Sequence, residues 1–451
     1  MMRQHLLLLS LLLATALMSQ TYVPPGDGTL SQAIADAADG DILELVPGGE
    51  YTESSAYTFG TIVDKNLTID VEGDEEDPIK AKLNIITPPD GESTIRLFEV
   101  GDNASLTLRN LELDGGYYGE ASADYAVTFY LGEFPAPTTV NNIRLENCHI
   151  HDFVSDVLAA GGSEMRGNLI IDSTFVDNCV MERTGTSVYY KYCGSHYISI
   201  TNSTFNTISS YGFRVSGPVE SNLPEHTPSA FIDHTTWYNV GTIDGREIIL
   251  CEKGPHLGQW KVSNSILVKQ INKDKTVINI KETLTPEQAE INNICMWDVG
   301  DRNWRDHPVS DTLNMDPEFA DPENGDFTLP AGSQLLTFGS DGGPIGDPRW
   351  ATNAVSVEQK TSAPTDFDLE QNYPNPFNPV TSISFHLEKD SHTRLAVYDM
   401  LGHEVMELIN QPMTAGSHRI TLDASDLATG VYLYQLHSSG QSLIRKMTVL
   451  K

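Results

Sequence analysis

The sequence ITNSTF at residues 200–205 has a near copy, IIDSTF, at 170–175 and another, IDHTTW, at 232–237. Each window starts and ends with an apolar residue and has a polar residue at its third position. Four more windows share this form: LRNLEL (108–113), LENCHI (145–150), VSNSIL (262–267) and INNICM (291–296). Successive windows start 37, 25, 30, 32, 30 and 29 residues apart. A period in this range indicates a repeat architecture.

The first and sixth positions of each window are both apolar, although a single flat strand would direct them to opposite faces. The chain must therefore turn between them. The third position is suited to such a turn, because Asn and Asp readily adopt left-handed backbone angles. Its occupants are Asn110, Asn147, Asp172, Asn202, His234, Asn264 and Asn293. Each window is thus predicted to be strand, bend and strand around one interior, with the third positions stacked as a ladder of hydrogen bonds.

Stacking such windows gives an all-β fold, a right-handed parallel β-helix. A β-propeller is the alternative, but its blades need about 40 residues or more and four antiparallel strands. Residues 28–46 (GTLSQAIADAADGDILELV) predict a short amphipathic helix followed by a strand. Such a helix would cap the N-terminal end of the coil and cover its open sheet edges.

The chain over residues 21–350 resembles the pectate-lyase-like superfamily of parallel β-helix proteins. The resemblance is carried by the windows and by the N-terminal cap. It implies the fold more than any activity. Residues 316–336 (DPEFADPENGDFTLPAGSQLL) are similar to the segment that closes the coil in bacterial members.

Composition and charge limit the classes of partner. The chain has 451 residues and a formal net charge of −34, so it should repel nucleic acid and anionic membranes. Residues 1–20 (MMRQHLLLLSLLLATALMSQ) predict a secretory signal peptide, and the mature chain shows no candidate transmembrane segment. The five cysteines form no disulfide or zinc pattern and are expected to be buried thiols, with one bridge possible.

A second region follows the predicted β-helix. Residues 351–366 are small and polar and predict a linker, and 367–451 alternate short strands and turns, as in a small β-sandwich. NYPNPFNP (372–379), VYDMLG (397–402) and GVYLYQL (430–436) resemble the type A C-terminal sorting domain of the type IX secretion system. The resemblance implies a Gram-negative source and an interaction of 367–451 with that secretion machinery. The protein would then be secreted or attached to the cell surface, with the domain cleaved or retained.

Between the windows lies a third strand per coil that carries basic and aromatic residues. Four examples are VYYKYC (188–193), YGFRVSG (211–217), REIILCEKG (246–254) and KTVINIKE (275–282). They should stack on one face and attract an anionic polysaccharide, because Arg and Lys pair with carboxylates and Tyr stacks on sugar rings. The alternative is that these charges lie at strand ends in solvent.

β-Elimination of a uronide needs a cation for the carboxylate, a base for the C5 proton and an acid for the leaving oxygen. The candidate catalytic residues are Lys253, Arg214, Lys191 and Tyr190. Arg246, Tyr192 and Lys281 are the candidate substrate-binding residues.

REIILCEKG resembles the segment of the chondroitinase-B and alginate lyase family in which acidic calcium ligands precede a catalytic lysine. Glu247 matches the second acidic ligand and implies calcium, the one cofactor considered. The first acidic position is Gly245 and Lys253 lies one residue late. The second basic residue of the family has no match. These departures weaken both the calcium site and the lyase activity.

Two weaker groups are also present. His149, His151 and Asp152 suggest a metal, although an HxH pair on a strand is more often structural. Asp114, Glu120, Asp124 and Glu133 suggest a carboxylate pair for glycoside hydrolysis, as chance also allows among 62 acidic residues. The sequence predicts an exported protein acting on uronate-containing polysaccharide, by elimination if it is catalytic. The alternative is a non-catalytic glycan-binding or adhesive surface protein.

Overall fold

The computed structural model divides the chain into two compact units, Met1–Val355 and Ser356–Lys451. The boundary falls within the predicted linker. In the first unit the structure describes residues 20–71, 80–85, 96–116, 125–129, 138–160, 169–191, 193–216, 229–243, 245–252, 258–281, 288–301, 309–340 and 342–351. In the second it describes residues 368–369, 372, 377, 379–387, 389, 391–398, 404–414, 416–425, 427–428, 430–438 and 441–449. The predicted signal peptide lies outside these residues, save Gln20.

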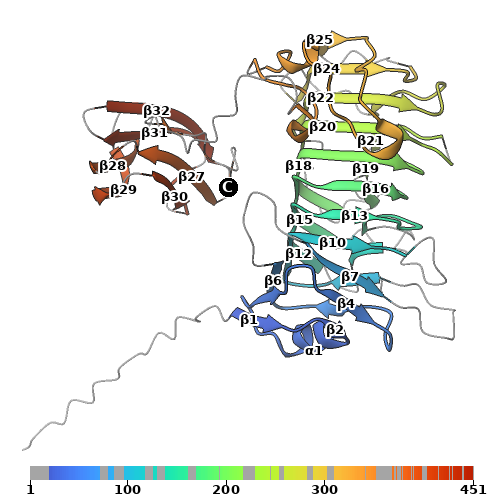
Figure 1. Ribbon diagram of the computed structural model, residues 1–451, viewed down its shortest axis with the longest axis horizontal. Coiled ribbons are helices and arrows are strands. Elements are labelled where there is room, and N and C mark those ends of the chain that lie inside the picture. The colour runs from blue at the N-terminus through green and yellow to red at the C-terminus, as the bar shows by residue number, and fades with distance from the viewer. Residues whose placement is uncertain are drawn as a thin grey trace, which may run out of the picture. The chain divides into compact units, whose positions relative to one another are not determined.

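The first unit is a parallel β-helix in which successive strands stack in register (Figure 1). Among the described residues, one parallel sheet has 17 strands: β1 (Gln20–Val23), β2 (Gly26–Asp27), β3 (Ile42–Leu45), β4 (Glu50–Glu53), β6 (Asn66–Val71), β7 (Ala81–Ile85), β9 (Ala104–Arg109), β10 (Leu111–Asp114), β12 (Thr138–Glu146), β13 (His149–His151), β15 (Leu169–Asp177), β16 (Val180–Thr184), β18 (Gly194–Ile208), β20 (Ser229–Val240), β22 (Trp260–Gln270), β24 (Ala289–Trp297) and β25 (Val309–Leu313). The second has eight: β5 (Gly60–Ile62), β8 (Arg96–Val100), β11 (Tyr125–Phe129), β14 (Leu158–Ala160), β17 (Val188–Lys191), β19 (Phe213–Ser216), β21 (Ile249–Glu252) and β23 (Ile278–Ile280).

The first and sixth positions of the repeat form two apolar columns inside the coil. The first column is Leu108, Leu145, Val176, Ile200, Ile232, Val262 and Ile291, each paired with the next. The second is Leu113, Ile150, Met181, Phe205, Trp237, Leu267 and Met296. All of these side chains are buried. The predicted strand, bend and strand around one interior is therefore confirmed.

One window was assigned wrongly from the sequence. Asp172 lies inside strand β15, and Phe175 points outward and is half-buried. The bend of this coil is at Asn178, whose φ of 52° is left-handed. The coil thus uses VDNCVM (176–181) rather than the more similar IIDSTF. Strand β15 pairs with β12 along its full length, and this pairing sets the position of the bend.

The predicted ladder of third positions forms in part. Asn147 donates from Nδ2 to Asn110 Oδ1 over 2.9 Å, and Asn178 donates to Asn147 Oδ1 over 3.2 Å. The next side chain leaves the ladder, because Asn202 Nδ2 donates to Asp177 Oδ1 instead, over 2.9 Å. The bends at His234, Asn264 and Asn293 keep left-handed backbone angles, like those at Asn110, Asn147 and Asn202.

Replacing Asn147 by alanine should lower the free energy of unfolding by about 2 kcal/mol. The substitution puts a residue without a local hydrogen-bonding side chain at φ 52° and removes both ladder bonds. Asn147→Gly removes the same bonds but accepts the angle, so about half of the loss should remain. Urea unfolding of the full chain measures both variants, and equal losses in the two would contradict the role of the backbone angle.

The N-terminal end of the coil is capped as predicted. Helix α1 (Thr29–Asp36) buries Leu30 and Ile34 against the core. Lys65 Nζ donates to the carbonyl oxygens of Ile34 and Ala37, at 2.7 and 3.1 Å. These bonds satisfy carbonyl groups at the C-terminal end of the helix, which have no partner within it. The cap is thereby fixed to the first coils.

Residues 315–340 and 342–351 close the other end of the coil and lie across the outward face of its last strands (Figure 1). This closing segment contains the short helices η1 (Pro322–Asn324), η2 (Gln334–Leu336) and η3 (Pro348–Ala351). Its apolar side chains cover Tyr238, Ile266 and Val268, which point out of the coil and form a separate small core with it. In the earlier coils the described residues on the same face include polar side chains such as Glu112, His149 and Glu182.

The second unit is a small β-sandwich, as predicted. One antiparallel sheet contains β26 (Asp368–Leu369), β27 (Val380–Leu387) and β30 (Gly416–Asp423). The other contains β28 (Ser391–Tyr398), β29 (Glu404–Met413), β31 (Gly430–Ser438) and β32 (Gln441–Val449). Leu395, Tyr434 and Met447 lie in its core.

The five cysteines, all in the first unit and all among the described residues, are buried, and none of them forms a disulfide bond. Within the part of the chain that the structure describes, no helix is long and apolar enough to cross a bilayer.

Candidate functional site

The outward face of the eight-stranded sheet carries Arg214 and several other predicted cations that the structure describes. Strands β17 and β19 pair so that Tyr189 lies beside Arg214. Arg214 Cζ lies 5.1 Å from the centre of the Tyr189 ring and 4.7 Å from that of Tyr211. Its side chain is 13% exposed. The guanidinium is therefore held in one position between two aromatic rings.

Glu252 on strand β21 joins two of these cations. Its Oε2 accepts from Arg214 Nη2 over 2.5 Å, and its Oε1 accepts from Lys281 Nζ over 3.0 Å. Burial opposes ionisation of Glu252, but the bonds from Arg214 and Lys281 outweigh burial and lower the pKa of this carboxyl. Burial likewise opposes the charge on Arg214, yet Glu252 raises the pKa of Arg214 overall. Arg214 can thus neutralise an anion, but it is not a proton acceptor.

The other predicted cations lie near this group. Arg246 is half-buried, with its Cζ 5.4 Å from the centre of the Tyr211 ring. Lys191 ends strand β17 and pairs in register with Ser216, which in turn pairs with Glu252. The face therefore gathers Lys191, Arg214, Arg246 and Lys281 over strands β17 to β23. Glu252, which was not among the predicted site residues, neutralises part of this charge through its bonds with Arg214 and Lys281.

The structure corrects one predicted site residue. Tyr190, the candidate proton donor, is fully buried, and its hydroxyl group bonds with Thr174 Oγ1 over 2.9 Å. Successive side chains of a strand point to opposite faces, so Tyr189 takes the outward position and Tyr190 the inward one. Tyr190 therefore cannot reach a polysaccharide. Lys253 and Tyr192 lie outside the described residues.

Glu247, the predicted calcium ligand, is 6% exposed and accepts a hydrogen bond from Asn279 Nδ2 over 3.0 Å. Asn279 Oδ1 is also buried and has no hydrogen-bond partner among the described residues. Calcium needs six to eight oxygen ligands. These two side chains supply too few to fit the ion by themselves, so calcium at Glu247 stays a prediction.

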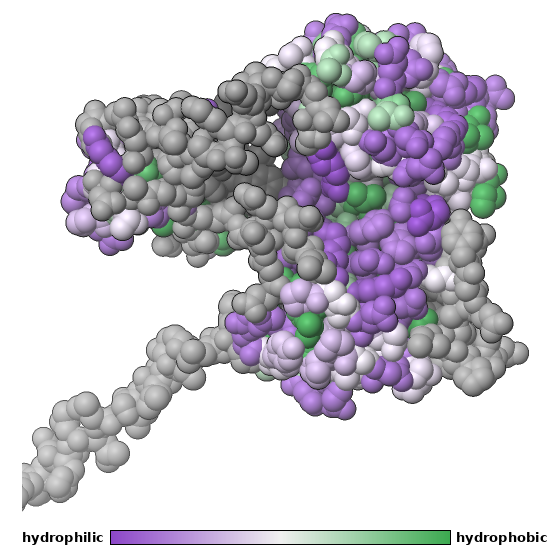
Figure 2. All heavy atoms as spheres, in the orientation of Figure 1, coloured by the Kyte–Doolittle hydropathy of each residue, from purple (hydrophilic) through white to green (hydrophobic). Residues whose placement is uncertain are grey.

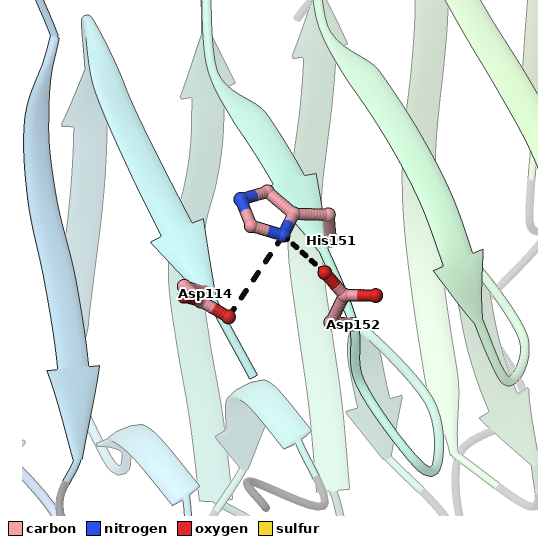
Figure 3. A group of neighbouring side chains, drawn as sticks. All are labelled: Asp114, His151 and Asp152. Carbon is pink, nitrogen blue, oxygen red and sulfur yellow. Dashed lines mark hydrogen bonds and ion pairs between the residues drawn. The ribbon is translucent and has the colours of Figure 1, made fainter. Parts of the chain in front are cut away.

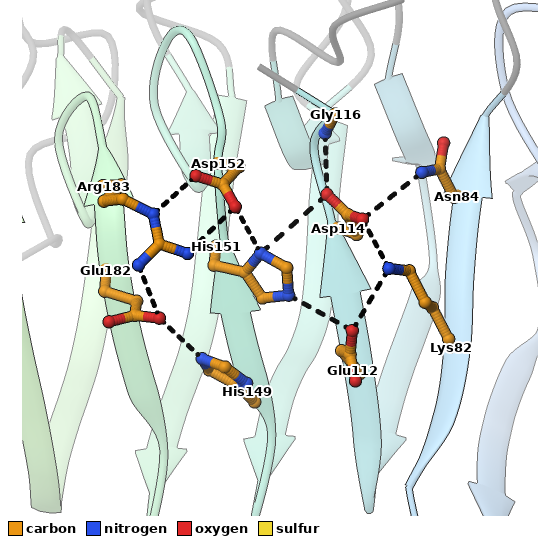
Figure 4. A network of polar contacts seen from close by, with 10 residues as sticks. All are labelled: Lys82, Asn84, Glu112, Asp114, Gly116, His149, His151, Asp152, Glu182 and Arg183. Atoms are coloured by element: carbon orange, nitrogen blue, oxygen red, sulfur yellow. Dashed lines mark hydrogen bonds and ion pairs between the residues drawn. The ribbon is translucent and has the colours of Figure 1, made fainter. Parts of the chain in front are cut away.

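A second polar site lies on the outward face of the 17-stranded sheet, in coils that precede those contacted by the apolar residues of the closing segment. Figure 2 shows a broad hydrophilic area over strands β10, β13 and β16. Strand pairing aligns two outward columns there (Figure 4). One column contains Lys82, Glu112 and His149. The other contains Asn84, Asp114, His151 and Glu182.

His151 lies at the centre of this network, 8% exposed. Its Nδ1 is 2.7 Å from Asp152 Oδ2 and 3.8 Å from Asp114 Oδ1, while its Nε2 is 3.3 Å from Glu112 Oε1. Lys82 Nζ donates to Asp114 Oδ2 over 2.7 Å and lies 3.4 Å from Glu112 Oε1. Three carboxylates from two neighbouring coils thus surround one imidazole.

The far side of the network is fixed by an arginine. Arg183 Nε and Nη2 donate to the two oxygens of Asp152 over 2.6 and 2.9 Å. Arg183 also donates from Nη1 to Glu182 Oε1 over 2.8 Å. Glu182 in turn lies 3.1 Å from Nε2 of His149, whose ring centre is 4.6 Å from that of His151. Each carboxylate of the network therefore has a cationic partner.

The pKa shifts follow from these contacts. The hydrogen bond with His151 lowers the pKa of Glu112 to about 2, although burial works against it. Burial lowers the pKa of His151, but Glu112 and Asp152 more than compensate and raise it. Burial would raise the pKa of Asp152, but Arg183 outweighs it and lowers that pKa. The site is thus built to hold positive charge between carboxylates.

Two tight turns position these carboxylates. Asp152 directly follows strand β13 and has a left-handed φ of 60°. Its carbonyl oxygen lies so close to Gly115 that a Cβ at Gly115 would be 2.3 Å away. Gly116 donates from its backbone nitrogen to Asp114 Oδ1 over 2.8 Å. The dipeptide Gly115-Gly116 therefore allows the coils to approach and orients Asp114 toward His151.

Sequence reasoning noticed part of this second site. It named His149, His151, Asp152 and Asp114, but it missed Lys82, Glu112, Glu182 and Arg183. Contacts such as His151–Glu112 and Arg183–Asp152 join residues 39 and 31 positions apart. No signal within one window shows them. Glu120, Asp124 and Glu133, the other proposed carboxylates, lie outside the described residues.

Comparison with known proteins identifies the second unit. Residues 371–450 match the family model of the secretion system C-terminal sorting domain. This unit is a sorting domain. The protein is therefore exported through the type IX secretion system, to the cell surface or the extracellular space, as predicted. Ahead of the sorting domain, residues 230–350 match a domain of unknown function, DUF5123, over the last coils and the closing segment.

Two solved structures show a partial likeness to this chain. The PL6 family alginate lyase AlyGC has a TM-score of 0.46 and 17% identity, and an arginine-to-alanine mutant of it has a TM-score of 0.45 and 17% identity. Each match covers 66% of this chain and 39% of the enzyme chain, so this chain spans well under half the length of these structures. Among curated proteins, none matches the sequence.

Proposed function

We propose that this exported β-helix protein engages a uronate-containing extracellular polysaccharide on the outward face of its eight-stranded sheet. The supporting observation is Arg214, held between the rings of Tyr189 and Tyr211 with Lys281 across a shared carboxylate. Arginine pairs with carboxylates through two parallel hydrogen bonds, and aromatic rings stack on sugars. The local excess of cations would draw an anionic chain to this face despite the net charge of −34.

In a lyase reaction, the residues of this face would have the following roles. Arg214 neutralises the substrate carboxylate, because its raised pKa keeps it charged. Burial raises the pKa of Tyr189, so its hydroxyl group stays protonated and is able to donate a proton to the leaving oxygen. Lys253 remains the proposed base, as the sequence suggests. Lys191, Arg246 and Lys281 bind further carboxylates along the chain.

One observation favours the second candidate function, a non-catalytic glycan-binding protein. Glu252 already pairs with both Arg214 and Lys281. A substrate carboxylate must displace Glu252 before it reaches either cation. Retention of a polysaccharide without cleavage requires contacts only at the edges of this face. The ion pairs of Glu252 with Arg214 and Lys281 then stay intact.

Incubating the purified mature chain with alginate, pectate and chondroitin tests the proposal. Ultraviolet absorbance detects the unsaturated product of elimination, and affinity electrophoresis detects retention. Arg214→Ala should weaken product formation about 10- to 100-fold, the loss of one charge-assisted contact with the substrate carboxylate. Retention that uses only the edges of this face should change little in the same variant. Arg144→Ala is the matched control, because Arg144 also lies over an aromatic ring, Phe175, and pairs with Glu146, but belongs to the other sheet.

The outcomes separate the two functions. Retention without product supports the glycan-binding protein and rejects the lyase. Neither retention nor product on any of the three polyanions would reject the proposed function altogether. An equal loss in Arg144→Ala would show that the effect does not belong to this face.

A further inference from the structure

The network around His151 has no part in the proposed polysaccharide function, since it lies on the other sheet of the coil. Figure 3 shows its centre, where the imidazole of His151 points between Asp114 and Asp152. One ligand atom from each of these three residues lies within 4.8 Å of the other two. Asp114 comes from strand β10, and His151 and Asp152 come from the next coil. The atoms therefore converge across a coil boundary.

We propose that Asp114, His151 and Asp152 bind a divalent first-row transition-metal ion such as Zn²⁺. Imidazole nitrogen together with carboxylate oxygen is a donor set that suits these ions. Calcium and magnesium are disfavoured, because they prefer oxygen ligands alone. Three protein ligands leave a fourth tetrahedral position for water or another ligand.

The geometry is close to what such an ion needs. Metal–ligand bonds of about 2.0–2.2 Å place tetrahedral donors roughly 3.4 Å apart. The distances from His151 Nδ1 to Asp152 Oδ2 and Asp114 Oδ1, 2.7 and 3.8 Å, lie on either side of this value. Side-chain movements on the order of 1 Å would complete the site.

The surroundings also match a metal site. A histidine ligand commonly donates its second ring nitrogen to a carboxylate, which fixes its orientation. Here Glu112 Oε1 faces Nε2 of His151 at 3.3 Å, which leaves Nδ1 directed at the two aspartates. Lys82, Gly116 and Arg183 hold the oxygens of Asp114 and Asp152 in place. Each proposed ligand therefore has a partner that orients it.

The charge of the network agrees with a divalent ion. Glu112, Asp114, Asp152 and Glu182 carry four negative charges, and Lys82 and Arg183 carry two positive ones. With neutral imidazoles, two negative charges remain. A divalent cation at Nδ1 would neutralise them and would link two coils through ligands on each.

Isothermal titration of the full chain, produced without a histidine tag and stripped with chelator, tests this site with Zn²⁺. One Zn²⁺ should bind per chain, and its addition should raise the melting temperature. His151→Ala should abolish this binding. Asp114→Asn, which keeps the shape of the side chain, should weaken it strongly. Glu112→Gln leaves all three ligands in place and should weaken binding about 10- to 100-fold.

His149→Ala is the matched control. This imidazole lies next to His151, with ring centres 4.6 Å apart, and contacts Glu182, but it is not one of the three proposed ligands. Zn²⁺ binding should be unchanged by its removal. The proposal would be overturned if Zn²⁺ did not bind, or if binding survived both His151→Ala and Asp114→Asn. It would also fail if His149→Ala removed binding as completely as His151→Ala, because the network would then act only as ion pairs joining the coils.

Discussion

Replacing Trp237 by alanine should lower the free energy of unfolding of the β-helix by about 3–5 kcal/mol, the range for large aromatic residues in a core. Trp237 is fully buried in the second apolar column. Its ring stacks on Phe205 with centres 3.8 Å apart and planes 7° apart. Its Nε1 donates to Thr235 Oγ1 over 2.7 Å. The substitution therefore removes an interior contact between two coils and a buried hydrogen bond together.

The residues around Trp237 are closely packed, so they are not expected to move into the cavity that Trp237→Ala would leave. A Cβ at Gly212 would lie 2.6 Å from the indole ring, which shows how near the backbone just before strand β19 passes. Trp237→Phe is the control, because it keeps a stacked ring and loses mainly the hydrogen bond and some volume. Urea denaturation of the full chain should show a loss of about 1–2 kcal/mol for Trp237→Phe. If Trp237→Ala cost no more than Trp237→Phe, the stack would not be the source of stability.

Removing the side chain of Arg349 should lower the free energy of unfolding by about 3–5 kcal/mol, because it leaves the buried carboxylate of Asp347 without its cationic partner. Arg349 Nε lies 2.8 Å from Asp347 Oδ2, and the Asp347 side chain is 1% exposed. Thr204 Oγ1 also donates to Asp347, over 2.6 Å. Arg349 Nη2 donates to the carbonyl oxygens of Cys179 and Asn202, at 3.4 and 3.2 Å. Arg349→Ala thus leaves the buried carboxylate of Asp347 without its cation. It also removes the hydrogen bonds that join the closing segment to two coils.

The pH dependence of this loss identifies its cause. Burial raises the pKa of Asp347 even with Arg349 present. Without Arg349 that pKa should rise further, so the folded state would hold a proton that the unfolded state releases. The proton on Asp347 contributes its full stability below the pKa that Asp347 has in the unfolded chain. This contribution is lost as the pH rises through the higher pKa that Asp347 has in the folded protein. The deficit of Arg349→Ala should therefore shrink as pH is lowered from neutral.

A double variant provides the control. Asp347→Asn in the Arg349→Ala background removes the stranded charge while keeping the size of the side chain. It should recover part of the stability at neutral pH and abolish the pH dependence. Urea unfolding at several pH values measures both effects. A deficit that is independent of pH and unchanged in the double variant would mean that lost packing, rather than the buried charge of Asp347, is responsible.

The coil itself could be predicted because the residues that specify each strand, bend and strand are consecutive in the sequence. Apolar residues at the first and sixth positions of a window, with Asn or His at the bend, specify two inward-facing strands and a left-handed angle. In one coil two stretches, IIDSTF (170–175) and VDNCVM (176–181), were possible sites for the bend. IIDSTF is the more similar to ITNSTF and was predicted, but the bend is at Asn178. The pairing of β15 along β12 decided this position, and no single window contains that information.

The sequence by itself determined the β-helix and its helical cap, because backbone preference and the periodicity of burial are local properties. The sorting domain was recognised from the resemblance of its motifs, such as NYPNPFNP (372–379), to a known family. Only the tertiary structure decided which side chains meet across coils. Bends are separated by as few as 24 residues, between Asn178 and Asn202, and by as many as 37, between Asn110 and Asn147. The register of one coil on the next therefore depends on strand pairing rather than on a fixed repeat. This register brought Glu252 between Arg214 and Lys281 and surrounded His151 with three carboxylates.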